Sequence, residues 1–228
     1  PMKVAVSISA DTATAAGVQV TEFTTQMSLD GERFALSPMT FGLFGGSYDG
    51  SLKGRLGDTL SVTLQPRAKG LNVAQLAAFG GSPDTIAGTL SGNGTFSAQG
   101  ADLSAVLATA NGKGTASIVD GTIKRLNLVR TVVLFFGRPA PDTAAASDQF
   151  DRIDVSFSLA NKIFRADMFS LRSRDADLTG SATLALETGV IDGTIDMILS
   201  EELSTQAGTD LARFTRDEGR IVLPAKLG

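Results

Sequence analysis

The chain has 228 residues, of which 43% are hydrophobic and 19% are charged, and it contains no cysteine, histidine or tryptophan. This length and apolar content exclude a disordered chain, and the formal net charge of −4 excludes the basic surface needed to bind nucleic acid. The missing thiols and imidazoles exclude disulfides, thiolate metal sites and histidine-based catalysis.

Alternation of apolar and polar residues with a period of two dominates the sequence and predicts antiparallel strands with one wet face. At least eight strands are implied, and the clearest alternation covers residues 4–8, 48–56, 60–64, 86–90, 153–159, 178–186 and 191–199. Two Asp-Gly pairs, Asp49-Gly50 and Asp192-Gly193, lie inside such segments. Their glycines therefore predict a bulge or a close approach of backbones rather than a hairpin tip.

Three segments depart from this period and predict short helices. The first covers residues 72–79, and the second begins after Asp102 with apolar residues at helical spacing over 103–110. The third covers about 124–136 and has a wide apolar face, which favours a helix that covers a sheet over one that lies on a membrane. No apolar run reaches the ~18 residues of a membrane-spanning helix.

The chain divides at a Pro/Ala/Ser-rich segment. We expect a β-rich half with three short helices over residues 1–137, a connecting loop over 138–149, and an antiparallel meander over 150–228 that continues the same sheet. In the second half four strands precede a polar stretch over 201–219, and one last strand follows it. The two halves are predicted to form a single unit, and the chain is expected to be part of a longer protein.

Carboxylates are the remaining candidates for catalysis or metal binding, and the sequence favours neither role. Asp192 and Asp196 share the wet face of one predicted strand, which is typical of a solvated surface rather than of a glycosidase pair. Asp175 and Asp177 lack the glycine and the distal glutamate of a calcium loop. We therefore predict that the protein is not an enzyme and holds no metal or cofactor.

The apolar face of the predicted sheet is the most informative feature. Aliphatic and phenylalanine side chains occupy one face of the long strands, and three short helices are too few to cover it. An incompletely covered apolar face of this kind is either a protein interface or a binding site for apolar ligands. A parallel β-helix would require regular coils, and the uneven strand spacing argues against it.

Seven short phrases follow one another along the chain: FGGSYDGSLKG (44–54), LNVAQL, IAGTLSGNGTFSAQG, DLSAVL, GKGTASIVDGTIKRLNL, DLTGSATLAL and RIVLPAKLG. In this order and spacing they resemble the C-terminal region of the AsmA family. The resemblance covers most of the chain and is weakest before Phe34.

The resemblance implies a protein of the Gram-negative envelope, with its body in the periplasm and an N-terminal helix tethering it to the inner membrane. The family is associated with outer-membrane integrity and is grouped with bridge-like lipid-transfer proteins. The implied fold is mainly β with a few short helices, in which a long, antiparallel, strongly curved sheet forms an open groove. The family contributes no catalytic residues.

We therefore expect phospholipids or other acyl lipids as partners, with the membrane reached through an anchor outside this chain. Acyl chains would lie against the apolar face of the strands while the headgroup stays in water. The alternative is a non-catalytic structural or interaction β-domain in envelope assembly, in which the same face packs on a protein. The candidate groove-lining residues are Ile153, Val155, Phe157, Leu159, Leu178, Leu184, Leu186, Ile195, Met197 and Leu199.

Overall fold

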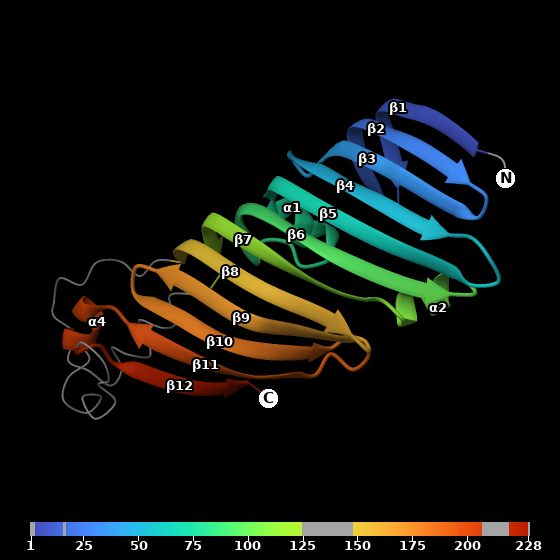
Figure 1. Ribbon diagram of the computed structural model, residues 1–228. Helices are drawn as coiled ribbons and strands as arrows, with labels where there is room; N and C mark the ends of the chain where they lie inside the picture. The colour runs from blue at the N-terminus through green and yellow to red at the C-terminus, as the bar shows by residue number, and fades with distance from the viewer. Residues whose placement is uncertain (1–2, 16, 125–147, 207–218, 228) are drawn as a thin grey trace.

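A computed structural model describes residues 3–15, 17–124, 148–206 and 219–227. Within these ranges twelve antiparallel strands form one sheet, and each strand pairs with the next along the chain (Figure 1). The strands are β1 (Lys3–Ala15), β2 (Val18–Asp30), β3 (Arg33–Leu43), β4 (Gly46–Arg55), β5 (Leu60–Asn72), β6 (Ile86–Gly100), β7 (Asn111–Ile123), β8 (Gln149–Ala160), β9 (Ile163–Ser173), β10 (Ala176–Ala185), β11 (Ile191–Leu199) and β12 (Val222–Leu227).

The predicted fold class is confirmed. The described structure is mainly β with three short helices, and the sheet is open, so that β1 and β12 form its two edges. Figure 1 shows the strands bending away from the viewer at one end, which gives the sheet the shape of a trough. The four strands predicted after the connecting loop are β8 to β11, and the predicted last strand is β12.

Two of the three predicted helices are present in the described residues. α1 (Val73–Phe79) begins after Asn72, whose side chain accepts a hydrogen bond from the backbone N–H of Gln75 at 3.1 Å. α2 (Leu103–Ala108) begins after Asp102 in the same way, and it ends two residues earlier than predicted. The helix predicted over 124–136 falls outside the described residues from position 125 onward.

A third described helix was not predicted. α4 (Glu201–Gln206) lies in the stretch that was interpreted only as polar, because six residues are too few to display a helical period. Its Leu203 is fully buried and packs with Leu199, Ala176 and Ile221 in a small core cluster. This helix therefore covers the ends of β10 and β11.

A second core cluster covers the neighbouring strands at the same end of the sheet. Phe150, Ile153 and Leu171 are buried together there, and partly buried apolar residues of β6, β7, β9 and β10 pack against them. Both clusters lie at the end of the strands from which α1 and α4 extend. Both core clusters thus lie at one margin of the sheet, while Val106 of α2 is buried at the opposite margin.

Glycines allow the strands to approach closely on the side toward which the sheet curves. A Cβ added at Gly114 would lie 2.5 Å from the carbonyl oxygen of Asn93, on the next strand, and 2.8 Å from Cζ of Phe157. Gly50 and Gly193 show the same conflict with a neighbouring backbone carbonyl. The expectation that the Asp-Gly pairs within strands mark close approaches is therefore confirmed.

Replacing Gly114 with valine is expected to lower the free energy of unfolding by about 1–3 kcal/mol, because the new side chain must displace a backbone and a ring. Thr115→Val, one residue along on the exposed opposite face, keeps a β-branched residue and is expected to change it by less than about 0.5 kcal/mol. Urea unfolding followed by circular dichroism measures both. Equal effects at the two positions would show that close strand approach is not what Gly114 provides.

Candidate functional site

The strand register places apolar residues in rows that cross the sheet on one face, which we call the inner face. Two rows define its margins. The core row contains Leu71, Leu90, Ile118, Ile153, Leu171, Leu178, Met197 and Leu223. The open row contains Val6, Met27, Leu36, Leu52, Leu64, Phe96, Gly112, Leu159, Phe164, Leu184 and Ile191.

The two rows differ in how far solvent reaches them. Leu171 of the core row is only 2% exposed because it belongs to the second core cluster. In the open row Val6 and Ile191 are each 48% exposed and Met27 is 37% exposed. Leu71, Ile153 and Leu171 of the core row are buried, whereas no residue of the open row is buried, so the accessible part of the inner face runs across the sheet from β1 to β11.

Nine of the ten candidate residues lie on the inner face. Val155, Phe157, Ile195, Leu159 and Leu184 are half-buried on the strands, and Leu178 and Met197 pack against the core clusters. Ile153 and Leu199 belong to the clusters themselves, so both contribute to the core rather than to accessible surface. Leu186 follows the end of β10 and is exposed.

Aromatic rings stack on one another along the inner face in two groups. In the first half Phe41 stacks on Tyr48 with ring centroids 4.4 Å apart, and Phe23 lies 6.2 Å from Phe41. In the second half Phe157 lies 5.2 Å from Phe164 and 6.3 Å from Phe96. These rings make broad contact surfaces for apolar ligands.

Glycines lie beneath the second aromatic group. β7 contributes Gly112 and Gly114 between Phe96 on β6 and Phe157 on β8. A Cβ at Gly112 would lie 2.5 Å from Cδ1 of Phe96, so the ring occupies the space that the missing side chain leaves. Consequently no side chain of β7 projects from the inner face between these two rings.

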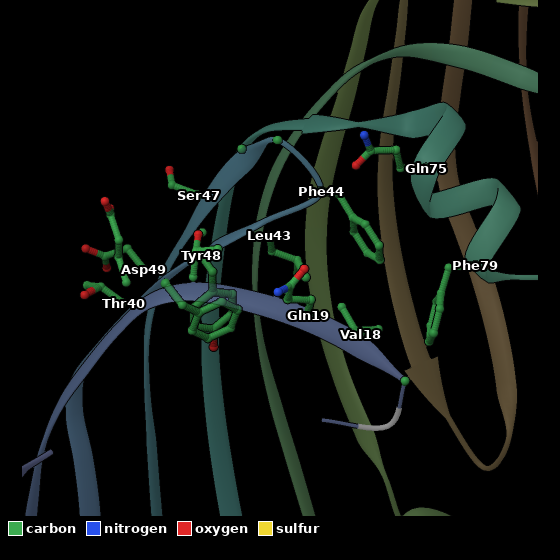
Figure 2. Close-up of a pocket in the computed structure, with 17 residues that line it drawn as sticks. Val18, Gln19, Thr40, Leu43, Phe44, Ser47, Tyr48, Asp49, Gln75 and Phe79 are labelled. Atoms are coloured by element: carbon green, nitrogen blue, oxygen red, sulfur yellow. The ribbon is translucent and has the colours of Figure 1, made fainter. Parts of the chain in front are cut away.

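A cavity of about 840 Å³ opens at the ends of β2, β3 and β4, next to α1. Figure 2 shows Phe44 from the β3–β4 turn and Phe79 from α1 side by side at one side of it, and their ring centroids are 5.9 Å apart. Phe41 and Tyr48 also line the cavity. Its volume lies in the range of small-molecule sites in proteins.

Sequence reasoning missed this N-terminal part of the inner face. The strand over residues 4–8 was predicted, but none of its residues was proposed for the groove, and β2 and β3 were not recognised individually. Phe23 and Phe41 do not fall into simple alternation because the register between β2 and β3 shifts twice. The available signal was the apolar alternation of Val4, Val6 and Ile8.

Tyr48 carries a hydroxyl group that is buried and has no hydrogen-bond partner in the described structure. Burial raises the pKa of Tyr48, and the negative charge of Asp49 raises it further. Because the chain has one tyrosine and no tryptophan, ultraviolet absorbance of tyrosinate reports this residue alone.

We expect the titration midpoint of Tyr48 in the folded protein to exceed that of the urea-unfolded chain, in which tyrosine titrates near pH ~10. The unfolded state then loses its proton first, so this contribution to stability is complete below the unfolded pKa and is lost as pH rises through the folded pKa. A folded midpoint at or below the unfolded one would contradict this burial.

The opposite, outer face of the sheet is polar. Exposed side chains form hydrogen bonds across strands, as between Thr24 and Thr40 at 2.6 Å, and ion pairs such as Arg152 with Asp154 at 2.6 Å. The hydrogen bond from Arg152 lowers the pKa of the Asp154 carboxyl. Such exposed pairs contribute little to stability, so this face mainly keeps the sheet in contact with water.

Within the described residues no cluster of acidic side chains is arranged to hold a metal ion. In the same part of the chain no helix has the length and apolar character that crossing a bilayer requires. The accessible inner face and the cavity at its margin are therefore the features on which a function can be based.

Comparison with known proteins identifies a family but no individual relative. No curated protein and no solved structure matches the chain significantly. The model of the AsmA family matches residues 2–168, which covers β1 to β8 and the first part of β9. The match spans well over half of the 228 residues, and the chain belongs to the AsmA family.

Proposed function

We propose that this protein is a periplasmic, non-catalytic groove domain that binds acyl chains and takes part in phospholipid transport between the inner and outer membranes. Membership of the AsmA family suggests an envelope-associated role of the lipid-transport type. The observation that carries the proposal is the open row, an apolar and accessible surface that continues across eleven strands. In this proposal the full protein is tethered to the inner membrane and contributes to outer-membrane homeostasis.

The physical basis of binding is the transfer of acyl chains from water to the inner face. Burial contributes about 0.8 kcal/mol for each methylene group, so chains are held without any directional contact. The polar outer face stays in water, and the headgroup projects beyond the margin of the trough. Because aliphatic and aromatic side chains contact methylene groups alike, the domain is expected to discriminate little between chains of similar length.

A smooth apolar floor also favours movement along the sheet. Gly112 and Gly114 leave no side chain projecting between the rings of Phe96 and Phe157. An acyl chain that slides from one strand to the next exchanges one apolar contact for another. No buried hydrogen bond has to be broken in this movement. Transport in this proposal requires no energy-coupled step within the domain itself.

The test is native mass spectrometry of the protein purified gently from bacterial cells, followed by lipid extraction and comparison with a mock purification. We expect phospholipid to co-purify, and we expect Val155→Asp to remove part of it, because it places a charge among the half-buried apolar residues of β8. Leu184→Asp is expected to act in the same direction.

Ser156→Asp provides the matched control, since it adds the same charge to the outer face of the same strand. It should leave lipid content unchanged, and circular dichroism should show intact strands in all variants. Lipid content that is equal in Val155→Asp and Ser156→Asp would contradict the groove assignment. A lipid-free protein with intact strands would instead favour a structural or interaction domain.

A further inference from the structure

The cavity at the ends of β2, β3 and β4 differs in chemistry from the rest of the inner face. The open row contains no charged residue, whereas the cavity is lined by aromatic rings and carboxylates together. The rings are Phe41, Phe44, Tyr48 and Phe79, and the carboxylates are Glu22 and Asp49. No lysine or arginine of the described chain lines it. Aromatic faces and carboxylates both attract cations, so this lining favours a positively charged ligand.

A bulge in β2 places Glu22 at the cavity. Thr21 pairs with Gly42 and Thr24 pairs with Thr40, so Glu22 and Phe23 together oppose a single residue of β3. The φ angle of Glu22 is +50°, in the left-handed region that residues with side chains seldom adopt. Bulges of this kind re-aim side chains and recur beside active sites. No described residue forms an ion pair or a hydrogen bond with the Glu22 side chain, so its charge is free to meet a ligand.

The second carboxylate of the lining already has a partner. Oδ1 of Asp49 is 3.5 Å from Nη1 of Arg67, which lies opposite it on β5 and outside the lining. Lys69 lies opposite Ser47 on the same strand and is also outside the lining. Glu22 is therefore the one lining charge without a partner among the described residues.

The aromatic side of the cavity is formed by two separate elements. Figure 2 shows Phe44 and Phe79 on one side, with Ser47 and Asp49 on the other. Phe79 is 54% exposed, so a ligand can reach its ring. A ring attracts a cation that lies over its face within about 6 Å of its centroid, and the same ring packs against an attached apolar chain. The cavity thus suits a ligand that is both cationic and apolar.

We infer that this cavity binds an organic ammonium group carried on an apolar chain. Phe44 and Phe79 contact the chain and the methylene groups next to the nitrogen, and Glu22 supplies the opposite charge. An anionic group at the same place meets two carboxylates and no lining cation, so it is rejected. Two sources supply such an ammonium group, namely the headgroup of a lipid on the inner face and a free amphipathic amine. Only the first source rests on the proposed function.

Three probes with the same eight-carbon chain test the preference for a cation. They are octylammonium chloride, neutral octanol and anionic octyl sulfate. Tyr48 lines the cavity and is the only tyrosine in a chain without tryptophan, so its fluorescence reports binding at this place. We expect octylammonium to bind more tightly than octanol, and octyl sulfate to bind most weakly. Equal affinities for the three probes, or tightest binding of octyl sulfate, would overturn the inference.

Variants of the lining test the assigned residues. Glu22→Gln should lower the affinity for octylammonium by about two- to fivefold, the range of an exposed ion pair, and should leave octanol binding unchanged. Phe79→Leu keeps an apolar side chain without a ring and should lower it by a similar factor of about two to five. Asp58→Asn is the matched control, since it removes the same charge from an exposed position beyond the opposite end of β4. Circular dichroism verifies that all variants are folded. An octylammonium affinity that is unchanged in Glu22→Gln, or that falls equally in Asp58→Asn, contradicts the site.

Vesicles distinguish the two sources of the ammonium group. The protein is incubated with vesicles of equal parts phosphatidylethanolamine and phosphatidylglycerol with matched acyl chains, and native mass spectrometry then identifies the lipid that it carries. Enrichment of the ethanolamine lipid that is lost in Glu22→Gln assigns the ammonium to a lipid headgroup. Equal uptake of both lipids, with octylammonium still preferred, assigns the cavity to a free amine and leaves the proposed function intact. Octylammonium binding without uptake of either lipid contradicts the proposed function and not the cavity.

Discussion

Replacing Leu171 with alanine is expected to lower the free energy of unfolding by about 2–5 kcal/mol. Leu171 is 2% exposed and is buried with Phe150 and Ile153 in the second core cluster, so the lost side chain leaves a cavity that its neighbours cannot fill. Urea unfolding followed by circular dichroism measures the change. Met168→Ala on the same strand is the matched control, since Met168 is 68% exposed, and it should change the value by less than about 0.5 kcal/mol.

The same pair of variants separates the core row from the binding surface. Under conditions in which both variants are folded, Leu171→Ala should retain the bound lipid of the unmodified protein, because the side chain is not accessible to an acyl chain. A loss of lipid without a loss of stability in Leu171→Ala would show that the groove extends into the core row. The core row would then belong to the lipid-binding surface of the inner face.

Most of the architecture was predictable because an antiparallel meander repeats a local pattern. In strands such as β8, β10 and β11 apolar and polar residues alternate regularly, and each strand pairs with the next along the chain. The apolar residues of one strand therefore indicate which residues of the next strand share the inner face. The short helices α1 and α2 were predictable because each begins with a capping side chain, Asn72 and Asp102. In both cases the signal lies within a few consecutive residues.

Properties that depend on contacts between distant residues were not predictable. Ile153 and Val155 occupy equivalent positions in the alternation, yet Ile153 is in the core and Val155 is half-buried. The difference arises from residues that surround Ile153 in the fold, namely Phe150 and Leu171, and not from the alternation itself. Alternation therefore identifies the inner face, whereas tertiary packing decides which part of that face remains open.

The family match also ends before the structure does. It stops at residue 168, near the register shift in β9, while the sheet continues through β10, β11 and β12 with the same inner face. Leu184 and Ile191 thus extend the open row beyond the matched range. Any function assigned to the inner face belongs to the whole sheet rather than to the matched segment alone.

The length of the open row predicts that separate parts of the groove bind lipid independently. Met27 on β2 and Val155 on β8 are six strand spacings apart, about 29 Å along the sheet at about 4.8 Å per spacing. An acyl chain in a bilayer spans about 15 Å, half of the hydrocarbon core, so one chain does not reach both positions.

We therefore expect Met27→Asp and Val155→Asp each to remove part of the bound lipid, and the double variant to remove most of it, so that the losses in lipids per chain add. Ser28→Asp with Ser156→Asp on the outer face is the matched double control and should retain the lipid. Native mass spectrometry gives the number of lipids per chain in each variant. If Met27→Asp alone abolished all binding, lipids would enter through the N-terminal end and reach β8 only from there, and the groove would act as a single path rather than as a series of equivalent sites.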